Sequence, residues 1–268
     1  MFRWIALLFV ALIGVSSSPA HPEIEEALAR LTAALAAAPT APSLFLARGD
    51  LYAKHADWAS AEANYATAAE LAPRLPGLAL ARGALALATG HTAEARTFLS
   101  DAITADPANP TALILRGRTY ARLHQPKAAL ADYAAAFRLL PSPSPELYLE
   151  RATLFASPAE AIHSLDEGIA RLGPILSLHL RALDLEISVS RTDDALRRLD
   201  LLASTSERRE LWLKRRGDTL ASAGRSAEAK AAYQAALAAI ALLPDWLVAS
   251  PDTVQLATEI KRLATTPP

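Results

Sequence analysis

Histidine is a common metal ligand, and three histidines recur along the first half of this chain. His55, His91 and His124 are each expected in a turn between two helices. Zinc–nitrogen bonds are about 2.0–2.1 Å long, whereas adjacent packed helices lie about 8–10 Å apart and equivalent turns about twice as far. The three histidines cannot share one metal ion, so we expect solvated turn residues and no metal site.

Catalytic motifs are also missing from the sequence. It has no serine nucleophile elbow, no HExxH pair and no glycine-rich phosphate loop. It has no cysteine, which excludes disulfides, cysteine-ligated zinc and thiol catalysis. We expect no catalytic residue and no cofactor, and we predict that the protein is not an enzyme. An enzyme or small-molecule binder that uses a pocket in the irregular segment 142–205 is the less favoured alternative.

The composition favours short helices that pack together. Hydrophobic residues make up 52% of the 268 residues but aromatic residues only 6%, so the apolar mass is mostly alanine and leucine, which favour helices. The 18 prolines and 10 glycines would interrupt these helices. The net charge of −1 provides no basic surface for a nucleic acid.

The first 20 residues are typical of an export signal. Arg3 precedes an apolar run from Trp4 to Val15, and the segment 18–20 offers small residues to signal peptidase. The run is shorter than the about 20 residues that span a membrane. We predict a signal peptide at 1–20, a mature chain without a membrane span, and export to the periplasm or the extracellular space. An uncleaved membrane anchor is the alternative.

A repeat of 34 residues organises the rest of the chain. Pro39, Pro73, Pro107 and Pro141 are each 34 residues apart. The best-kept copy starts at Pro110, and at offsets 8, 11, 20, 24, 27 and 32 it carries Gly117, Tyr120, Ala129, Tyr133, Ala136 and Pro141. Small residues let two antiparallel helices approach closely, and bulky residues fill the space beside them. Proline ends the second helix of each pair.

These offsets resemble those of the tetratricopeptide repeat (TPR), which has the same period. The resemblance implies an all-α, right-handed superhelical α-solenoid of helix-turn-helix repeats, in which each hairpin stacks on its neighbours. The residues that carry the resemblance are expected to be structural: Gly49, Tyr52, Ala61, Tyr65, Ala68, Pro73, Gly83, Ala95, Ala102, Pro107, Gly117, Tyr120, Ala129, Tyr133, Ala136, Pro141, Gly217, Ala229, Tyr233 and Ala236.

The repeats predict an order of segments along the chain. A capping helix at 21–41 precedes three regular repeats at 42–143, two irregular repeats at 144–205 and a sixth repeat at 206–243. A C-terminal capping helix and a disordered tail, the latter beginning at Thr265, occupy 244–268. In the fourth repeat we expect the inter-helix turn to be about three residues short, and in the fifth one residue longer than standard.

One arginine recurs in every repeat, immediately before offset 8. The six residues are Arg48, Arg82, Arg116, Arg151, Arg181 and Arg216. One interpretation is a cationic row that meets an acidic partner. The favoured interpretation is structural: each stem covers apolar surface, and each guanidinium pairs with a local acid or a helix C-terminus.

The resemblance also implies where a partner would bind, because first-helix residues at offsets 2, 5, 9, 12 and 13 line the concave groove in this family. The candidate groove residues are Leu46, Asp50, Lys54, Leu80, Ala84, Leu87, Ile114, Arg118, Arg122, Leu149 and Thr153. They predict a largely aliphatic groove with a few charges. Leu87 has a competing role, which is to fill the space that Ala86 leaves. The aliphatic row at offset 5 becomes core if the register is shifted by one residue.

The sequence therefore predicts an exported, non-enzymatic scaffold or adaptor. Its partner would be a protein that inserts an apolar or helical peptide segment into the groove. The alternative is an accessory subunit of an envelope assembly or export complex that binds through its convex face or its edge.

Overall fold

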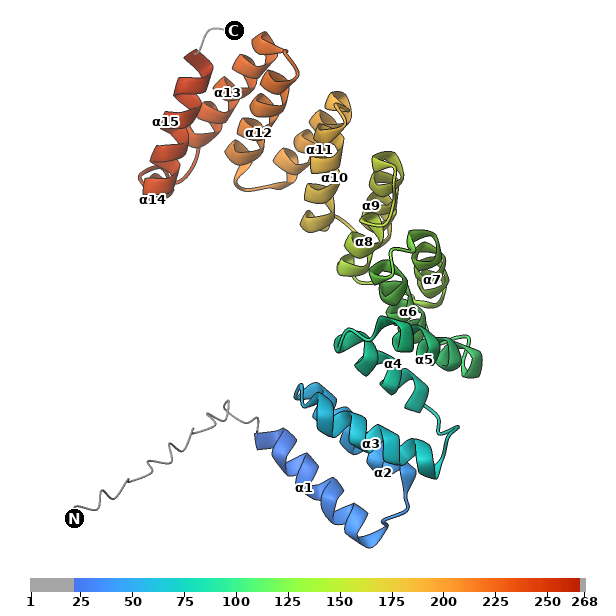
Figure 1. Cartoon of the computed structure of the whole chain (residues 1–268). Coiled ribbons are helices and arrows are strands. Elements are labelled where there is room, and N and C mark those ends of the chain that lie inside the picture. Colours follow the sequence, from blue (N-terminus) through green and yellow to red (C-terminus); the bar gives the residue numbers. More distant parts are fainter. Residues whose placement is uncertain (1–21, 266–268) are drawn as a thin grey trace, which may run out of the picture. The chain divides into compact units, whose positions relative to one another are not determined.

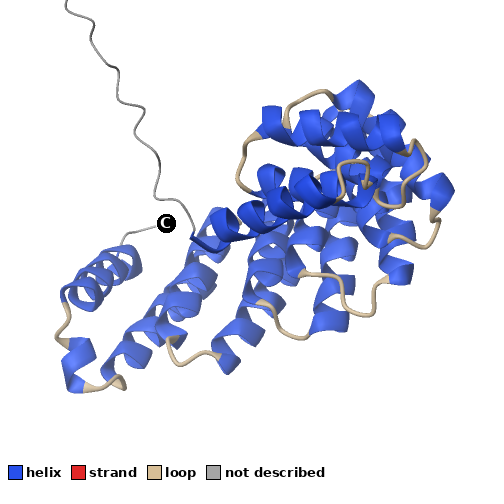
Figure 2. Ribbon diagram, turned by 90° about the horizontal axis from the view of Figure 1, so that it is seen from below, coloured by secondary structure: helices blue, strands red, loops and turns tan. Residues whose placement is uncertain are grey.

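In the computed structural model, residues 22–265 are described, and they form 15 α-helices (Figure 1). The predicted all-α class and the pairing of helices into hairpins are confirmed. Loops join the helices, and no strand is present within residues 22–265 (Figure 2). No described helix is long and apolar enough to cross a membrane. The predicted signal peptide at 1–20 lies outside the described residues, as does the tail at 266–268.

The chain divides into two compact bodies, Met1–Thr119 and Tyr120–Pro268. We call their described parts the N-terminal body (22–119) and the C-terminal body (120–265). The N-terminal body contains α1 (Pro22–Ala37), α2 (Pro42–Lys54), α3 (Trp58–Leu71), α4 (Leu78–Ala88), α5 (Thr92–Ala105) and the first part of α6 (Pro110–Arg122). Here α1 packs on α2, and the pairs α2–α3 and α4–α5 are the first two hairpins.

The C-terminal body contains the irregular repeats and the sixth repeat. Its helices after α6 are α7 (Pro126–Leu139), α8 (Pro145–Ala152), α9 (Pro158–Leu172), α10 (Leu176–Ser188), α11 (Thr192–Thr205), α12 (Arg209–Ser222), α13 (Ser226–Ala241), α14 (Asp245–Val248) and α15 (Pro251–Thr265). The short helix α14 was not predicted. Thr265, expected in the tail, is the last residue of α15.

The signature residues explain why the two helices of a hairpin pack so closely against each other. The Cβ of a side chain at Gly49 would lie 2.5 Å from Cε1 of Tyr65, and at Gly83 it would lie 2.6 Å from Cγ of Leu99. Both distances are too short for real atoms, so only glycine permits this approach of the two helices. Ala61 and Ala95 at the same crossings have no exposed surface. The four prolines at the 34-residue spacing each lie two residues beyond the end of a helix, after α1, α3, α5 and α7.

The last repeat is closed by α15. Ile260 and Ala264 of this helix are buried in a core cluster with Leu220 and Tyr233, whereas Lys261 on the same helix is exposed. One face of α15 is therefore apolar and covers the sixth repeat, and another face is polar and meets solvent.

The fourth repeat departs from the standard at a different place from the one predicted. Its first helix, α8, has 8 residues where α2 has 13, and it ends at offset 8. The link at 153–157 that follows is longer than the three-residue turn at 55–57. The three-residue deficit is therefore in the helix and not in the turn. The fifth repeat has a turn of standard length at 189–191, so the extra residue expected there is wrong.

Five hairpin turns share one backbone conformation. The central residue of each three-residue turn has a positive φ, and these residues are Ala56, Gly90, His124, Ser190 and Gly224. Left-handed backbone costs a residue with a Cβ roughly 1–2 kcal/mol and costs glycine almost nothing. Three of the five turns are therefore strained.

We expect Ala56→Gly to stabilise the protein by about 0.5–1 kcal/mol, because relief of the strain exceeds the extra freedom of glycine in the unfolded chain. The matched reverse change is Gly90→Ala. Gly90 also has a positive φ, and no atom lies within 4 Å of the Cβ that alanine would add. It should destabilise by about 1 kcal/mol through strain alone. Urea unfolding of both variants checks the signs, and two changes of the same sign would contradict this account.

Candidate functional site

The aliphatic row predicted at offset 5 lies partly in the core. Leu46, Leu80, Ile114 and Leu149 are all half-buried. Leu46 packs against the core cluster that contains Tyr65, and Leu80 packs against the cluster that contains Leu99. These side chains contribute to stacking and leave only part of their surface to solvent.

The charged and small groove candidates are more accessible. Asp50, Lys54, Arg122 and Thr153 are exposed, while Ala84 and Arg118 are half-buried. Thr153 lies just beyond the end of α8, so it is not on a helix, and its hydroxyl donates to the Glu150 carbonyl at 2.7 Å.

Asp50 has a structural contact in addition to its exposure. The Tyr65 hydroxyl donates to Asp50 Oδ1 at 2.8 Å, and Tyr233 donates to Asp218 Oδ1 at 2.9 Å in the equivalent place of the sixth repeat. Burial raises the pKa of both tyrosines, and the accepting carboxylates raise it further. The acid at offset 9 thus fixes the bulky residue at offset 24 of its own hairpin.

Leu87 does not offer surface to a partner. Its exposed fraction is 5%, and it forms a cluster with Ala86, Ala95 and Leu99. The side chain thus lies in the core of the second repeat, beside the small Ala86. Leu87 is a core residue rather than a projection in the groove.

The three turn histidines occupy three different positions. His55 caps the end of α2, His91 precedes α5, and His124 is the strained central residue of its turn. His91 Nδ1 lies 2.9 Å from the Thr89 hydroxyl. No group of three or more possible ligands that could hold a metal ion occurs within residues 22–265.

The recurring arginines connect first helices to second helices. Arg48 Nε donates to Asn64 Oδ1 at 2.8 Å, and Arg216 Nε to Asp200 Oδ1 at 2.9 Å. The remaining contacts of the row include those of Arg82 with Glu62 and Phe98, of Arg116 with Ser100, and of Arg151 with Ser164 and Glu167. Arg181 is the exposed member. These contacts favour the structural interpretation of the row.

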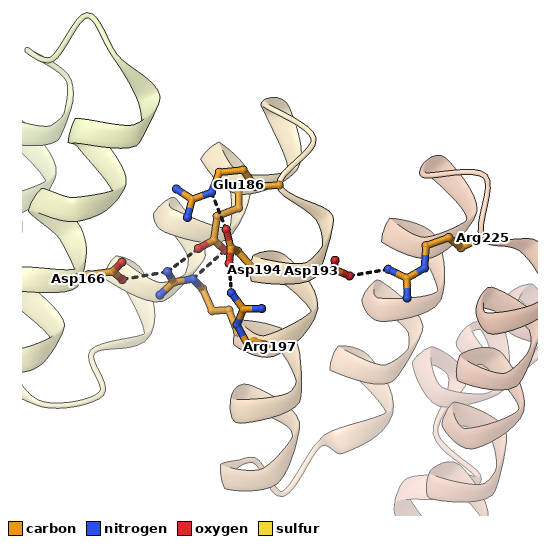
Figure 3. A network of polar contacts seen from close by, with 8 residues as sticks. Asp166, Glu186, Asp193, Asp194, Arg197 and Arg225 are labelled. Atoms are coloured by element: carbon orange, nitrogen blue, oxygen red, sulfur yellow. Dashed lines mark hydrogen bonds and ion pairs between the residues drawn. The ribbon is translucent and has the colours of Figure 1, made fainter.

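A polar network in the fifth repeat was not predicted (Figure 3). Arg198 of α11 donates through Nε to Glu186 Oε2 at 3.0 Å and through a terminal nitrogen to Glu186 Oε1 at 2.6 Å. It also donates to Asp166 Oδ1 of α9 at 2.9 Å. The Glu186 side chain is only 3% exposed. Arg198 therefore links three helices, and it neutralises a carboxylate that has little access to water.

Sequence reasoning missed this network because Arg198 and Asp166 lie outside the signature offsets. One signal was present. Glu186 stands at offset 12, where the three regular repeats have Ala53, Leu87 and Ala121. A carboxylate at a position that otherwise carries an aliphatic side chain needs a buried cation.

His179 belongs to the same network. It is 3% exposed, and its Nδ1 lies 3.4 Å from an Arg198 nitrogen. Burial lowers the pKa of His179 and Arg198 lowers it further, while Asp166 and Glu186 oppose these effects. The folded state therefore favours the neutral imidazole.

We expect a pH dependence of stability from His179. Because its folded pKa lies below the ordinary value of 6.5, its contribution is present above pH 6.5 and is lost as pH falls toward the folded pKa. The urea midpoint should fall more between about pH 7.5 and about pH 5.5 in the wild type than in His179→Gln. The control is His163→Gln on the exposed surface of α9, which should keep the wild-type dependence. An equal fall in all three proteins would exclude His179 as the cause.

Within residues 22–265, the large apolar side chains with the greatest exposure lie at the junction of α13, α14 and α15. Leu242 is 85% exposed and Trp246 is 75% exposed. Val254 at the start of α15 is 52% exposed. Exposed apolar groups of this kind often mark interaction sites.

Comparison with known proteins supports the fold. Residues 166–244 match the family described as the tetratricopeptide repeat-like domain. No curated protein sequence matches the chain. A crystal structure of a tetratricopeptide repeat protein from Parabacteroides merdae is 17% identical, with 84% of this chain and 99% of that chain covered and a TM-score of 0.53.

Two further solved structures have the same kind of fold. PilW, described as a widely conserved type IV pilus biogenesis factor, is 18% identical, with 69% of this chain and 86% of that chain covered and a TM-score of 0.58. Pseudomonas aeruginosa pilF is 20% identical, with 68% of this chain and 83% of that chain covered and a TM-score of 0.56. The repeat spacing, the hairpin packing and these likenesses together show that this chain has a TPR-like repeat fold.

Proposed function

We propose that the protein is a non-enzymatic scaffold that binds a peptide segment of a partner protein along its first helices. The TPR-like fold suggests protein–protein interaction as the class of function. The observation that carries the finer proposal is the surface of α2 and α4 in the N-terminal body. Half-buried Leu46, Leu80 and Ala84 lie at groove offsets of the repeat, and Asp50 and Lys54 at further groove offsets are exposed.

This combination suits an amphipathic segment. Aliphatic side chains of the partner would pack on the half-buried leucines and Ala84, while its polar residues would meet the flanking charges. The core packing of Leu46 and Leu80 limits the depth of such a groove. We therefore expect a segment that lies across the surface, and affinity that comes from several repeats.

Affinity capture with the full chain as bait tests this proposal. The groove variant combines Lys54→Glu and Ala84→Glu in the candidate groove. The α5 variant combines Ala93→Glu and Arg96→Glu at exposed positions of a second helix. Both double variants change the net charge equally. The groove variant should lose a partner that the α5 variant retains. Loss in both, or in neither, would refute binding along the first helices.

We further propose export to the periplasm or the extracellular space, on the basis of the apolar run at 4–15 and the small residues at 18–20. Fractionation of cells that produce the tagged full chain, with mass determination of its N-terminus, tests export and cleavage together. A product that retains residue 1 in the cytoplasm would refute both.

A second candidate is an accessory subunit of an envelope assembly that binds through its edge. The exposed Leu242 and Trp246 favour it. In the same capture experiment, Leu242→Ser with Trp246→Ser would then remove the partner, and the groove variant would not.

A further inference from the structure

A hollow beside α9 lies outside all the groove candidates. Its volume is about 400 Å³, and its lining includes Arg151 of α8, Phe155 of the link at 153–157, and Ala159 and Glu160 of α9. It occurs in the repeat whose first helix ends five residues early, as the lengths of 8 and 13 residues for α8 and α2 show. The link supplies Phe155 at a place where the regular repeats continue as helix.

Arg151, the cation in the lining of the hollow, is already neutralised. Arg151 is 8% exposed and donates through Nε to Ser164 Oγ at 2.8 Å and through a terminal nitrogen to Glu167 Oε2 at 2.6 Å. Its guanidinium carbon lies 4.5 Å from the centroid of the Phe137 ring. Arg151 and Glu167 therefore cancel each other and leave the charge of the hollow to its other residues.

The remaining charge of the lining is negative. Glu160 is the third residue of α9 and is exposed, and it makes no ion pair within residues 22–265. Phe155 is half-buried and Ala159 is exposed, so an apolar surface adjoins the free carboxylate. A carboxylate beside an aromatic side chain is complementary to a cation with an apolar stem.

We propose that this hollow receives an arginine side chain of a protein partner. Its stem would pack on Phe155 and Ala159, and its planar guanidinium would stack on the ring and pair with Glu160. Arg151 makes the same combination of contacts inside the chain, with an aromatic ring and a carboxylate. Lysine fits less well because its ammonium neither stacks nor forms a bidentate pair. The free carboxylate disfavours anionic lipids and nucleic acids. This site does not depend on the groove proposed above.

The test uses two peptides that differ in one side chain, which is charged in the first and neutral in the second. One is an octapeptide of alanine and leucine with a single central arginine, and the other has citrulline in its place. We expect the arginine peptide to shift the backbone amide NMR signals of Ala159, Glu160 and His163 in the full chain. The citrulline peptide should bind at least about twofold more weakly.

Matched variants make the result decisive. Glu160→Gln should weaken the arginine peptide about two- to fivefold, the range that an exposed ion pair supports. The control is Glu94→Gln, because Glu94 is likewise the exposed third residue of a second helix, α5. It should leave binding unchanged. The proposal is overturned if the arginine peptide does not bind, if its shifts lie on other helices, if citrulline binds equally well, or if both variants behave alike.

Discussion

Gly83→Ala is expected to destabilise the protein by about 1–3 kcal/mol through overpacking at the helix crossing. The new Cβ would lie 2.6 Å from Cγ of Leu99 and 3.2 Å from its backbone nitrogen. A rotamer change of Leu99 can relieve the first contact, but the second can be relieved only if α4 and α5 move apart. Urea unfolding monitored by circular dichroism measures the loss.

The sign of this effect separates packing from helix propensity. Alanine normally stabilises a helix relative to glycine by about 0.5–1 kcal/mol, so a gain in stability would refute the close crossing. Leu99→Ala alone should cost about 2–5 kcal/mol because it leaves a cavity. Combined with Gly83→Ala it should cost less than the sum of the two, because the added methyl group occupies part of that cavity.

Arg198→Met should destabilise the protein by about 3–5 kcal/mol, because it leaves Glu186 as an uncompensated buried carboxylate. The Arg198 side chain is 11% exposed and that of Glu186 is 3% exposed, so the contacts that are lost are largely shielded from water. The double change Arg198→Met with Glu186→Met should recover most of the loss, since it removes both charges.

The neighbouring arginine provides the control for this experiment. Arg197 is on the same helix, and its side chain is 71% exposed although it contacts Asp194. Arg197→Met should change stability by no more than about 0.5 kcal/mol. If both arginines give small losses, Arg198 does not neutralise Glu186 in the way the structure indicates.

The repetitive part of the fold could be predicted because it depends on contacts at fixed sequence separation. The crossing of Gly49 with Tyr65 and that of Gly83 with Leu99 both span 16 residues, and the sequence shows the same spacing in the third and sixth repeats. The hairpins and their order along the chain could therefore be predicted from the periodicity of the sequence. The periodicity also indicated the structural role of the arginine row.

Features that do not repeat could not be predicted in this way. The deficit in the fourth repeat has the same length whether the helix or the turn is shortened, so spacing alone could not place it. The contact of Arg198 with Asp166 spans 32 residues, and neither residue belongs to the repeat signature. The depth of Leu46 and Leu80 depends on how neighbouring hairpins stack, and a pattern of residue types does not contain that information.

The polar face of α15 has a consequence for association between molecules. The face of the sixth repeat that α15 covers is the kind of surface on which a further hairpin would stack, and it includes Leu220 and Tyr233. If that surface were open, the starting repeat of another copy could add to it. Such a head-to-tail contact gives a ring if its rotation closes and an open filament if it does not. Because α15 covers this surface and presents the exposed Lys261 on another face, this part of the sixth repeat is closed to a further hairpin.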